Sequence, residues 1–290
     1  MPSDLPSSLL ITSRRNPLVR RLRALAGRQG RELEGLVLIE GTHLVQELVP
    51  LLQGRHASVE LVATPGWLEK HQVLLARLTP APRLQVVSEE VLQASLSTVH
   101  PDGVAALIPL ALLPQCPARP DFVLALDRLQ DPGNLGTLLR TALAADVEVV
   151  WQGSGADPLS PKVVRSSAGA VLHLPHQRFG PSEEDGVEVL RQELLAARDR
   201  GLQVVATLVP GAGGGLPVMP YWELDWTKPT VLVLGNEGRG LHPELQACCT
   251  HGVTLPHSAA VESLNVASAA VPLLLERRRA TMAAPSQQSG

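Results

Sequence analysis

The stretch VLVLGNEGRGL, residues 231–241, joins four apolar residues directly to a glycine-rich segment. An unbroken apolar run is typical of a parallel strand that is buried on both faces of its sheet. The glycines allow positive φ angles and let the backbone approach a ligand closely. Their spacing is not the Gly-x-Gly-x-x-Gly of a dinucleotide site, and Pro243 opens the next helix too late for that motif. The stretch therefore predicts an α/β fold with a ligand loop after Leu234.

A second strand and loop of this kind lies near the middle of the chain. The apolar run Phe122–Leu126 leads into DRLQDPGN, residues 127–134, and then into a predicted helix that carries Arg140. Asn134 is a preferred helix N-cap, so a strand, a turn and a capped helix would explain this pattern without any ligand. Ligands of open α/β sheets nevertheless bind beyond the carboxyl ends of strands, where this loop is expected. Taken alone, the loop leaves both interpretations open.

The third stretch is Leu255-Pro256-His257-Ser258, followed closely by Ser263-Leu264-Asn265-Val266-Ala267. Its second part opens an apolar helix that is predicted to end near Arg279. Ser263 as the N-cap, and the basic cluster Arg277–Arg279 near the carboxyl end, are sufficient structural explanations when each is taken singly. Their combination with the two other loops is harder to explain by structure alone.

Apolar periodicity predicts alternating strands and helices along the rest of the chain, which indicates α/β architecture on both sides of a proline-rich segment. We expect an N-terminal domain over residues 1–113, a linker over 114–120, a second domain over 121–281 and a disordered tail over 282–290. The predicted strands are 36–39, 59–63, 84–87, 104–108, 122–126, 148–151, 171–174, 203–208, 231–234 and 253–255. The predicted helices are 16–25, 42–48, 67–78, 89–96, 134–145, 161–167, 187–198 and 263–279.

The charge of the chain favours a local rather than a general nucleic-acid surface. The formal net charge is −3, which argues against a protein covered in positive potential. Arginines nevertheless crowd the amino-terminal region, as a solvated helix face or a phosphate-contacting surface would require. They are Arg14, Arg15, Arg20, Arg21, Arg23, Arg28 and Arg31. Because aromatic residues make up only 2% of the chain, we expect any nucleic-acid contact to be mainly to phosphate and ribose.

Cysteine usage and hydropathy indicate a cytoplasmic protein without a membrane partner. The three cysteines, Cys116, Cys248 and Cys249, have no spacing that suits a disulfide framework or a zinc site. The amino terminus lacks the apolar core of a signal peptide. The longest apolar run, Val104–Leu113, is too short to span a bilayer and contains Pro109.

Taken together, the three stretches resemble the SpoU/TrmH family of SPOUT-class RNA ribose methyltransferases. The matching motifs occur in the family's order and cover Phe122 to about Arg279. They are Asp131-Pro132-Gly133-Asn134-Leu135-Gly136 with Arg140, Gly235-Asn236-Glu237 with Gly240-Leu241, and Leu255-Pro256 with Ser263-Leu264-Asn265-Val266. A fourth stretch, Lys162–Gly169 with Arg165, Ser166 and Ser167, is also similar to the family. His257, where the family usually has an apolar residue, and Pro272 inside the last helix depart from the pattern.

The amino-terminal region carries a weaker resemblance. Asn16-Pro17-Leu18-Val19 and Val37-Leu38-Ile39-Glu40-Gly41 look like the substrate-binding domain of family members that act on large-subunit ribosomal RNA. The resemblance implies a smaller α/β domain with a ribosomal-protein-like fold. The charge pattern separately leads us to expect that this region contacts RNA through Arg14, Arg15, Arg20, Arg21 and Arg23.

The family resemblance implies a carboxyl-terminal α/β fold with a deep trefoil knot, which is a rare exception to the rule that chains do not knot. S-adenosylmethionine would be held by groups around Thr207, Gly235, Leu255 and Leu264, and no metal would be required. The catalytic set would be Asn134, Arg140, Glu237, Ser263 and Asn265. The resemblance further implies a homodimer that acts on RNA and not on DNA, because only RNA has the 2′-hydroxyl.

The resemblance also assigns roles within this catalytic set. Asn134, Ser263 and Asn265 would orient the ribose and the catalytic side chains, and Glu237 would fix the geometry of the loop and of the arginine. Arg140 has been viewed in the family as the base. Because a guanidinium is hard to deprotonate, we favour contact with the adjacent phosphate and stabilisation of the developing oxyanion.

Three other functions are compatible with parts of this pattern. One is 2′-O-methylation of transfer RNA, against which the N-terminal domain argues. Another is a catalytically inactive RNA-binding protein of the same fold, although the intact motif residues argue against decay. The last is a nicotinamide oxidoreductase, which the missing dinucleotide fingerprint disfavours.

Overall fold

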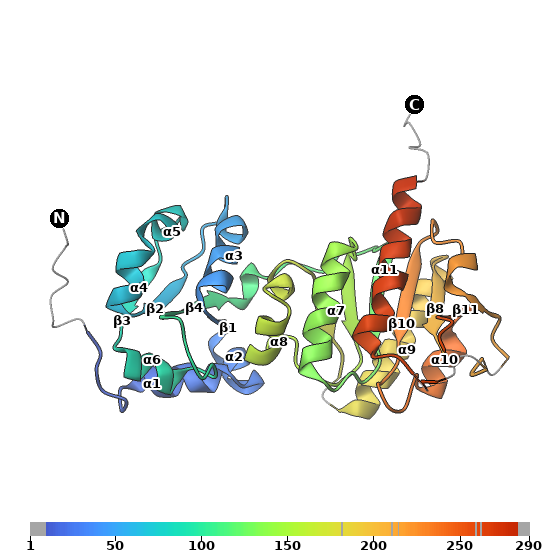
Figure 1. The fold of residues 1–290 in the computed structure, drawn as a ribbon, viewed down its shortest axis with the longest axis horizontal. Coiled ribbons are helices and arrows are strands. Elements are labelled where there is room, and N and C mark those ends of the chain that lie inside the picture. Colours follow the sequence, from blue (N-terminus) through green and yellow to red (C-terminus); the bar gives the residue numbers. More distant parts are fainter. Residues whose placement is uncertain are drawn as a thin grey trace. The chain divides into compact units, whose positions relative to one another are not determined.

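The computed structural model describes residues 10–180, 182–209, 211–213, 215–258, 260–261 and 263–283. The expected tail over residues 282–290 therefore lies almost wholly outside the described residues. Contacts divide the chain into two units (Figure 1). The N-terminal unit runs to Pro114 and also includes Asp157–His173, and the C-terminal unit comprises Gln115–Ala156 and the chain from Leu174 onward.

The N-terminal unit is built on a four-stranded sheet in the order β1-β4-β2-β3. β4 runs antiparallel to its neighbours β1 and β2, whereas β2 and β3 are parallel. The strands are β1 Leu36–Glu40, β2 Glu60–Ala63, β3 Arg83–Val86 and β4 Val104–Pro109. The helices are α1 Pro17–Leu25, α2 Arg28–Glu34, α3 Thr42–Leu52, α4 Pro65–Lys70, α5 Gln72–Arg77, α6 Glu89–Ser95 and α8 Pro161–Ser166, with short 3₁₀ turns at Leu110–Leu112 and Ala170–Leu172.

Helix α1 shows how the sequence forms this unit. The side chain of Asn16 accepts a hydrogen bond from the backbone N–H of Leu18 at 2.9 Å and so caps the helix, and Pro17 occupies its first position. Leu18, Leu22 and Leu25 follow at helical spacing and are buried against the sheet and α6. The predicted helix over 16–25 is thus confirmed.

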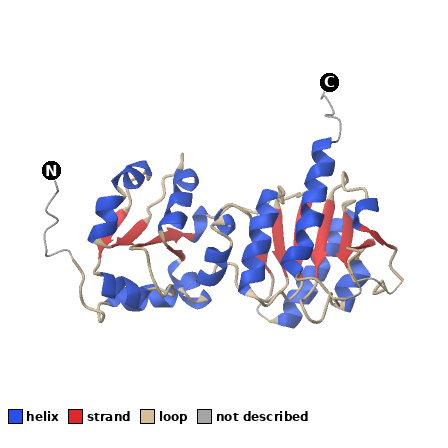
Figure 2. Ribbon diagram, in the orientation of Figure 1, coloured by secondary structure: helices blue, strands red, loops and turns tan. Residues whose placement is uncertain are grey.

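The C-terminal unit is a seven-stranded sheet in the order β7-β6-β5-β10-β8-β11-β9, and its strand pairs are parallel. Helices cover both faces of this sheet (Figure 2). The strands are β5 Phe122–Leu126, β6 Val149–Gln152, β7 His176–Arg178, β8 Gln203–Thr207, β9 Val218–Pro220, β10 Thr230–Leu234 and β11 His251–Thr254. The helices are α7 Pro132–Ala144, α9 Glu183–Asp199, α10 Pro243–Cys248 and α11 Val266–Ala283, with a 3₁₀ turn at Tyr221–Glu223.

The opening stretch of the sequence lies where its apolar run predicted. β10 pairs with β5 on one side and β8 on the other, and each of its residues is buried. The predicted doubly buried parallel strand is confirmed. Because parallel strands end at one edge of the sheet, the loops after β5, β8 and β10 leave the sheet on the same side.

Several elements differ from the sequence-based expectations. The strand expected over 171–174 is wrong, because Val171 and Leu172 are buried in a 3₁₀ turn and β7 begins only at His176. Gly169, with φ +85°, turns the chain just before that point. The short elements α2 and β9 were not predicted, since neither has a long apolar period, and of α10 only the start at Pro243 was expected.

The segment Asp157–His173 packs with the N-terminal unit, whereas the expected domain over 121–281 would contain it. Arg31, which is buried, forms an ion pair with Asp157. The guanidinium of Arg165 contacts the buried Glu40 carboxylate at 3.0 Å. The motif stretch Lys162–Gly169 is therefore a contact segment of the N-terminal unit.

Candidate active site

Three loops meet at the carboxyl edge of the C-terminal sheet. The backbone N–H of Asp127, just after β5, donates to the carbonyl of Leu234 at the end of β10, at 2.9 Å. The side-chain amide of Asn236 then donates to the carbonyl of Arg128 at 2.8 Å. The loop after β5 and the glycine-rich loop after β10 are thus joined directly.

A chain of side-chain hydrogen bonds links the three motif stretches. Asn265 Nδ2 donates to Asn134 Oδ1 at 2.9 Å, and Asn134 Nδ2 donates to Glu237 Oε1 at 3.3 Å. Asn265 Oδ1 accepts from the backbone N–H groups of Ala267 and Ser268 at 3.0 and 3.2 Å. In both asparagines the amide nitrogen donates and the amide oxygen accepts, and this fixes the orientation of each amide group. We call Asn265, Asn134 and Glu237 the amide chain.

Two expected helix caps are wrong. Asp131, not Asn134, caps α7, because its Oδ1 accepts from the Asn134 backbone N–H at 2.7 Å. Asn265, not Ser263, accepts from the first backbone N–H groups of α11. A capping oxygen must face its own helix. Since Asp131 takes that role, the Asn134 side chain is free to join the amide chain.

Glu237 holds the loop after β5 in place. Its carboxylate oxygens accept from the backbone N–H groups of Gln130 and Asp131, at 3.4 Å each. These contacts agree with a role in fixing the loop. Glu237 was also expected to fix the geometry of Arg140, but the structure shows no contact between them. The exposed Arg140 side chain has no hydrogen bond or ion pair with any described residue. A guanidinium without a protein partner can bind an anion.

A buried ion pair that the sequence analysis missed lies under both loops. Asp127 is fully buried and accepts from Arg128 Nε at 2.7 Å, Arg128 Nη2 at 3.0 Å and the backbone N–H of His242 at 2.8 Å. The hydrogen bond to Asp127 raises the pKa of the Arg128 guanidinium. Arg128 has φ +52°, in the left-handed region that non-glycine residues avoid. The pair therefore braces the loop after β5 against the end of the glycine-rich loop.

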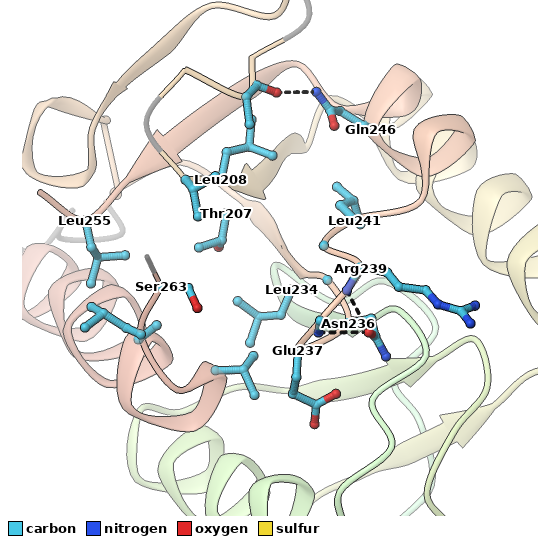
Figure 3. Close-up of a pocket in the computed structure, with 18 of the residues that line it drawn as sticks. Thr207, Leu208, Leu234, Asn236, Glu237, Arg239, Leu241, Gln246, Leu255 and Ser263 are labelled. Carbon is cyan, nitrogen blue, oxygen red and sulfur yellow. Dashed lines mark hydrogen bonds between the residues drawn. The ribbon is translucent and has the colours of Figure 1, made fainter. Parts of the chain in front are cut away.

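A cavity of about 440 Å³ lies beside the amide chain. All four residues expected to hold a cofactor line it, namely Thr207, Gly235, Leu255 and Leu264, and so do Glu237 and Ser263. Figure 3 shows Thr207, Leu255 and Ser263 around the same space. Thr207 Oγ1 is buried and has no hydrogen-bond partner among the described residues. A buried hydroxyl without a partner suits a ligand that would supply one.

Both departures from the family pattern are accommodated locally. His257 lines the cavity, and its Nδ1 lies 2.7 Å from the carbonyl oxygen of Leu255. Since a carbonyl can only accept, Nδ1 carries the hydrogen of this contact. Helix α11 continues through Pro272, and the next two residues, Leu273 and Leu274, are fully buried.

The amino-terminal arginines fall into two groups. Arg14, Arg15 and Arg20 are exposed. Arg21 instead forms ion pairs with Glu34 at 2.7 Å and Glu60 at 3.1 Å, and Arg23 donates to a backbone carbonyl. The exposed side chains of the first group can therefore reach a phosphate. Those of the second group are already bonded to other groups of the N-terminal unit.

Among the described residues, no group of three or more His, Cys, Asp or Glu side chains is arranged to hold a metal ion. None of the helices in the described part of the chain has the length and apolar character needed to cross a bilayer.

A parallel α/β sheet with a cavity and hydrogen-bonded polar side chains beyond its strand ends defines a ligand-binding protein of the open-sheet class. The model of the SpoU rRNA Methylase family matches residues 121–274, and that of the MRM3-like substrate binding domain matches residues 16–106. The chain belongs to the SpoU methylase family.

Relatives match along nearly the whole chain. A protein of Synechocystis sp. named as an uncharacterized tRNA/rRNA methyltransferase is 42% identical over 98% of this chain and 97% of its own length. RlmP of Bacillus subtilis, named as a 23S rRNA guanosine 2′-O-methyltransferase, is 31% identical over 92% of this chain and 98% of its own length. The AdoMet-bound rRNA methyltransferase of Sinorhizobium meliloti superposes with a TM-score of 0.73 at 30% identity, covering 93% of this chain and 97% of that one.

Proposed function

We propose that this protein transfers a methyl group from S-adenosylmethionine to a ribose 2′-hydroxyl of RNA, and that its substrate is large-subunit ribosomal RNA. The observation that carries the proposal is the amide chain, which brings Asn134 at the start of α7, Glu237 and Asn265 together beside one cavity. The name of the Bacillus subtilis relative states the same reaction on 23S ribosomal RNA.

The residues of the cavity fit this cofactor. Thr207 Oγ1 offers a buried hydroxyl, the backbone around Gly235 and Leu255 offers polar groups, and Leu264 offers an apolar wall. This mixture suits a molecule with a nucleoside at one end and an amino acid at the other. When bound, S-adenosylmethionine supplies a methyl group on a positively charged sulfur, ready for displacement by an oxygen.

The side chains of this chain must then place the ribose and assist loss of its hydroxyl proton. The amide chain is held from both ends, by the start of α11 at Asn265 and by the β5 loop at Glu237. Such a preorganised group can orient a hydroxyl at little entropic cost. Arg140 grips the neighbouring phosphate and stabilises the negative charge that develops on the oxygen. Ser263, on the cavity wall, helps to orient the ribose.

We further propose that the C-terminal unit contains the trefoil knot of SPOUT proteins, that the chain forms a homodimer, and that it acts in the cytoplasm. The parallel sheet and the superposition on the Sinorhizobium meliloti enzyme support the first point. The three cysteines, which are free thiols, support the cytoplasmic location. Light scattering of the purified protein tests the dimer, since a mass near 30.9 kDa would contradict it.

Labelled methyl transfer tests the proposed function. Unmodified 23S ribosomal RNA and unmodified transfer RNA are each incubated with the protein and labelled S-adenosylmethionine, beside Arg140→Ala and Asn134→Ala. We expect label in ribosomal RNA only, reduced at least about 100-fold in both variants. Label in transfer RNA would identify the alternative substrate. Tight RNA binding without transfer to either RNA would favour an inactive RNA-binding protein.

A further inference from the structure

A second cavity, of about 610 Å³, lies within the N-terminal unit, the part of the chain that the substrate-binding family model matches. Its walls come from the start of α3, from α4 and the residue that follows it, from α6 and from the loop before β4. No residue of the sequence motifs discussed above lines this cavity. Gly103 lines the cavity and has φ +105°. It packs so closely on Trp67 that an added Cβ atom would lie 2.9 Å from Trp67 Cβ.

A pair of stacked rings forms one wall of this cavity. The rings of Trp67 and His71 lie 4.5 Å apart with an interplanar angle of 16°, and no other stacked pair occurs among the described residues. Trp67 is buried, and its Nε1 donates to Thr42 Oγ1 at 2.7 Å. Because Trp67 covers one face of the imidazole, only the other face and the edge of His71 can meet a ligand.

The wall also has unused hydrogen-bonding capacity. His71 Nδ1 lies 2.9 Å from the Trp67 carbonyl oxygen, so Nδ1 carries the hydrogen and Nε2 is an acceptor in the neutral ring. Thr42 Oγ1 already accepts from Trp67, which leaves its own hydrogen free to donate. The Thr42 hydroxyl can donate to the edge of a nucleobase that stacks on the open face of His71. His71 Nε2, whose lone pair lies in the ring plane, can accept only from a group beside the ring, such as a ribose hydroxyl.

The charges around this cavity are mixed. Lys70 and His100 line it together with the carboxylates of Glu89 and Asp102, and Asp102 is occupied by the backbone N–H of Thr42 at 2.7 Å. A phosphate site would gather cations without acids. The balance of charge suits an uncharged polar ring better than a phosphate.

We propose that this cavity binds one unpaired nucleobase of the RNA substrate, stacked on the open face of His71 and read at its edge by the Thr42 hydroxyl. The inference rests on the proposed function for the identity of the ligand as RNA. It adds a base contact to the composition-based expectation of contacts mainly to phosphate and ribose, because histidine is not counted among the aromatic residues that make up 2% of the chain.

The test is binding of unmodified 23S ribosomal RNA to the full-length protein, without cofactor, by filter retention. The variant is His71→Ala, and the matched control is Gln72→Ala, an exposed neighbour that does not line the cavity. Loss of one stacked base weakens binding by about 10- to 100-fold. We expect that rise in Kd for His71→Ala and none for Gln72→Ala, with kcat at saturating RNA and cofactor affinity unchanged.

His71→Phe keeps a stacking ring but loses Nε2, so we expect a smaller rise in Kd, and this variant decides the matter if His71→Ala fails to fold. A Kd within twofold of the parent for both folded variants would overturn the proposal. So would tight binding of free mononucleotides with an unchanged Kd for RNA, which would indicate a small-molecule site. Because binding is measured without methyl transfer, an inactive protein whose RNA binding still depends on His71 would refute the proposed function and leave this site standing.

Discussion

At the scale of single residues, the amide chain explains why three separated motifs contain two asparagines and a glutamate. An asparagine side chain can donate and accept at once, so Asn134 passes a fixed orientation from Asn265 to Glu237. An aspartate or glutamate in the middle of this chain could only accept when ionised. The chemistry of the amide therefore sets the residue type at Asn134 and Asn265.

Asn265→Asp separates the catalytic contact from the helix cap. The new carboxylate still accepts from Ala267 and Ser268, but it can no longer donate to Asn134. We expect kcat to fall about 100-fold with cofactor affinity and unfolding free energy nearly unchanged. Asn265→Ala, which also removes the cap, should additionally lose about 1 kcal/mol of stability. Equal kcat for Asn265→Asp and the parent enzyme would contradict the amide chain.

Arg128 combines a stabilising ion pair with an unfavourable backbone. Both Arg128→Ala and Arg128→Gly remove the contacts to buried Asp127, but only glycine adopts the φ of +52° without strain. We expect urea unfolding to show Arg128→Gly more stable than Arg128→Ala by about 1 kcal/mol. Equal stabilities of the two variants would mean that the backbone at this position relaxes.

Cys249 makes the stability of the C-terminal unit depend on pH. Burial raises the pKa of this thiol to about 12, whereas a thiol in the unfolded chain has a pKa of about 8.5. The folded chain thus keeps a proton that the unfolded chain loses, so this stabilisation is complete below that lower pKa and falls as pH rises through the window. Urea unfolding at pH 7.5 and 10 should show a larger loss for the parent protein than for Cys249→Ala. Identical losses would contradict the shift.

At the scale of elements, the sequence predicted best what long apolar runs encode. β5 and β10 were predicted within a residue of their ends, because strands buried on both faces are continuously apolar. The run Val171–Leu174 was misread because a short apolar stretch has no period that separates a strand from a buried turn. Helix α2 escaped prediction because its one buried residue is Arg31.

Caps and ion pairs between neighbours were the hardest features of the site to predict. Asp131 and Asn134 are both good N-cap residues, and only the observed contact shows which of them caps α7. The four expected cofactor residues do line the cavity, but that expectation came from the family resemblance rather than from local pattern. The buried pair Asp127–Arg128 has no periodic signature, although an aspartate directly after a buried strand was a usable signal.

The cap of α7 can be tested directly. Asp131→Ala removes the acceptor for the Asn134 backbone N–H, and we expect a loss of about 1 kcal/mol in unfolding free energy. Asp131→Ser keeps a capping oxygen and should retain most of that stability. If instead Asn134→Ala cost as much and Asp131→Ala cost nothing, the assignment of the cap would be wrong.

At the scale of the whole molecule, the chain divides the proposed work between two units. The C-terminal unit holds the cavity and the amide chain, and the N-terminal unit holds the exposed arginines and the second cavity. The net charge of −3 means that RNA attraction must come from local groups.

Arg14, Arg15 and Arg20 should carry that local attraction. Each phosphate contact that is lost lowers the slope of log K against log salt by about 0.7 to 0.9. We expect the triple alanine variant to bind ribosomal RNA more weakly, with a shallower salt dependence. Arg21→Ala, which loses its ion pairs to Glu34 and Glu60, should leave the slope unchanged. A shallower slope for Arg21→Ala alone would reverse this assignment.

The position of the transferred methyl group tests the central claim most directly. Ribosomal RNA labelled by this protein would be digested to nucleosides, and the label assigned to ribose or base by mass spectrometry. We predict label only on the ribose 2′-oxygen of a single nucleotide, and its loss with Asn134→Ala. Label on a base, or ribose label that survives Asn134→Ala undiminished, would contradict the account.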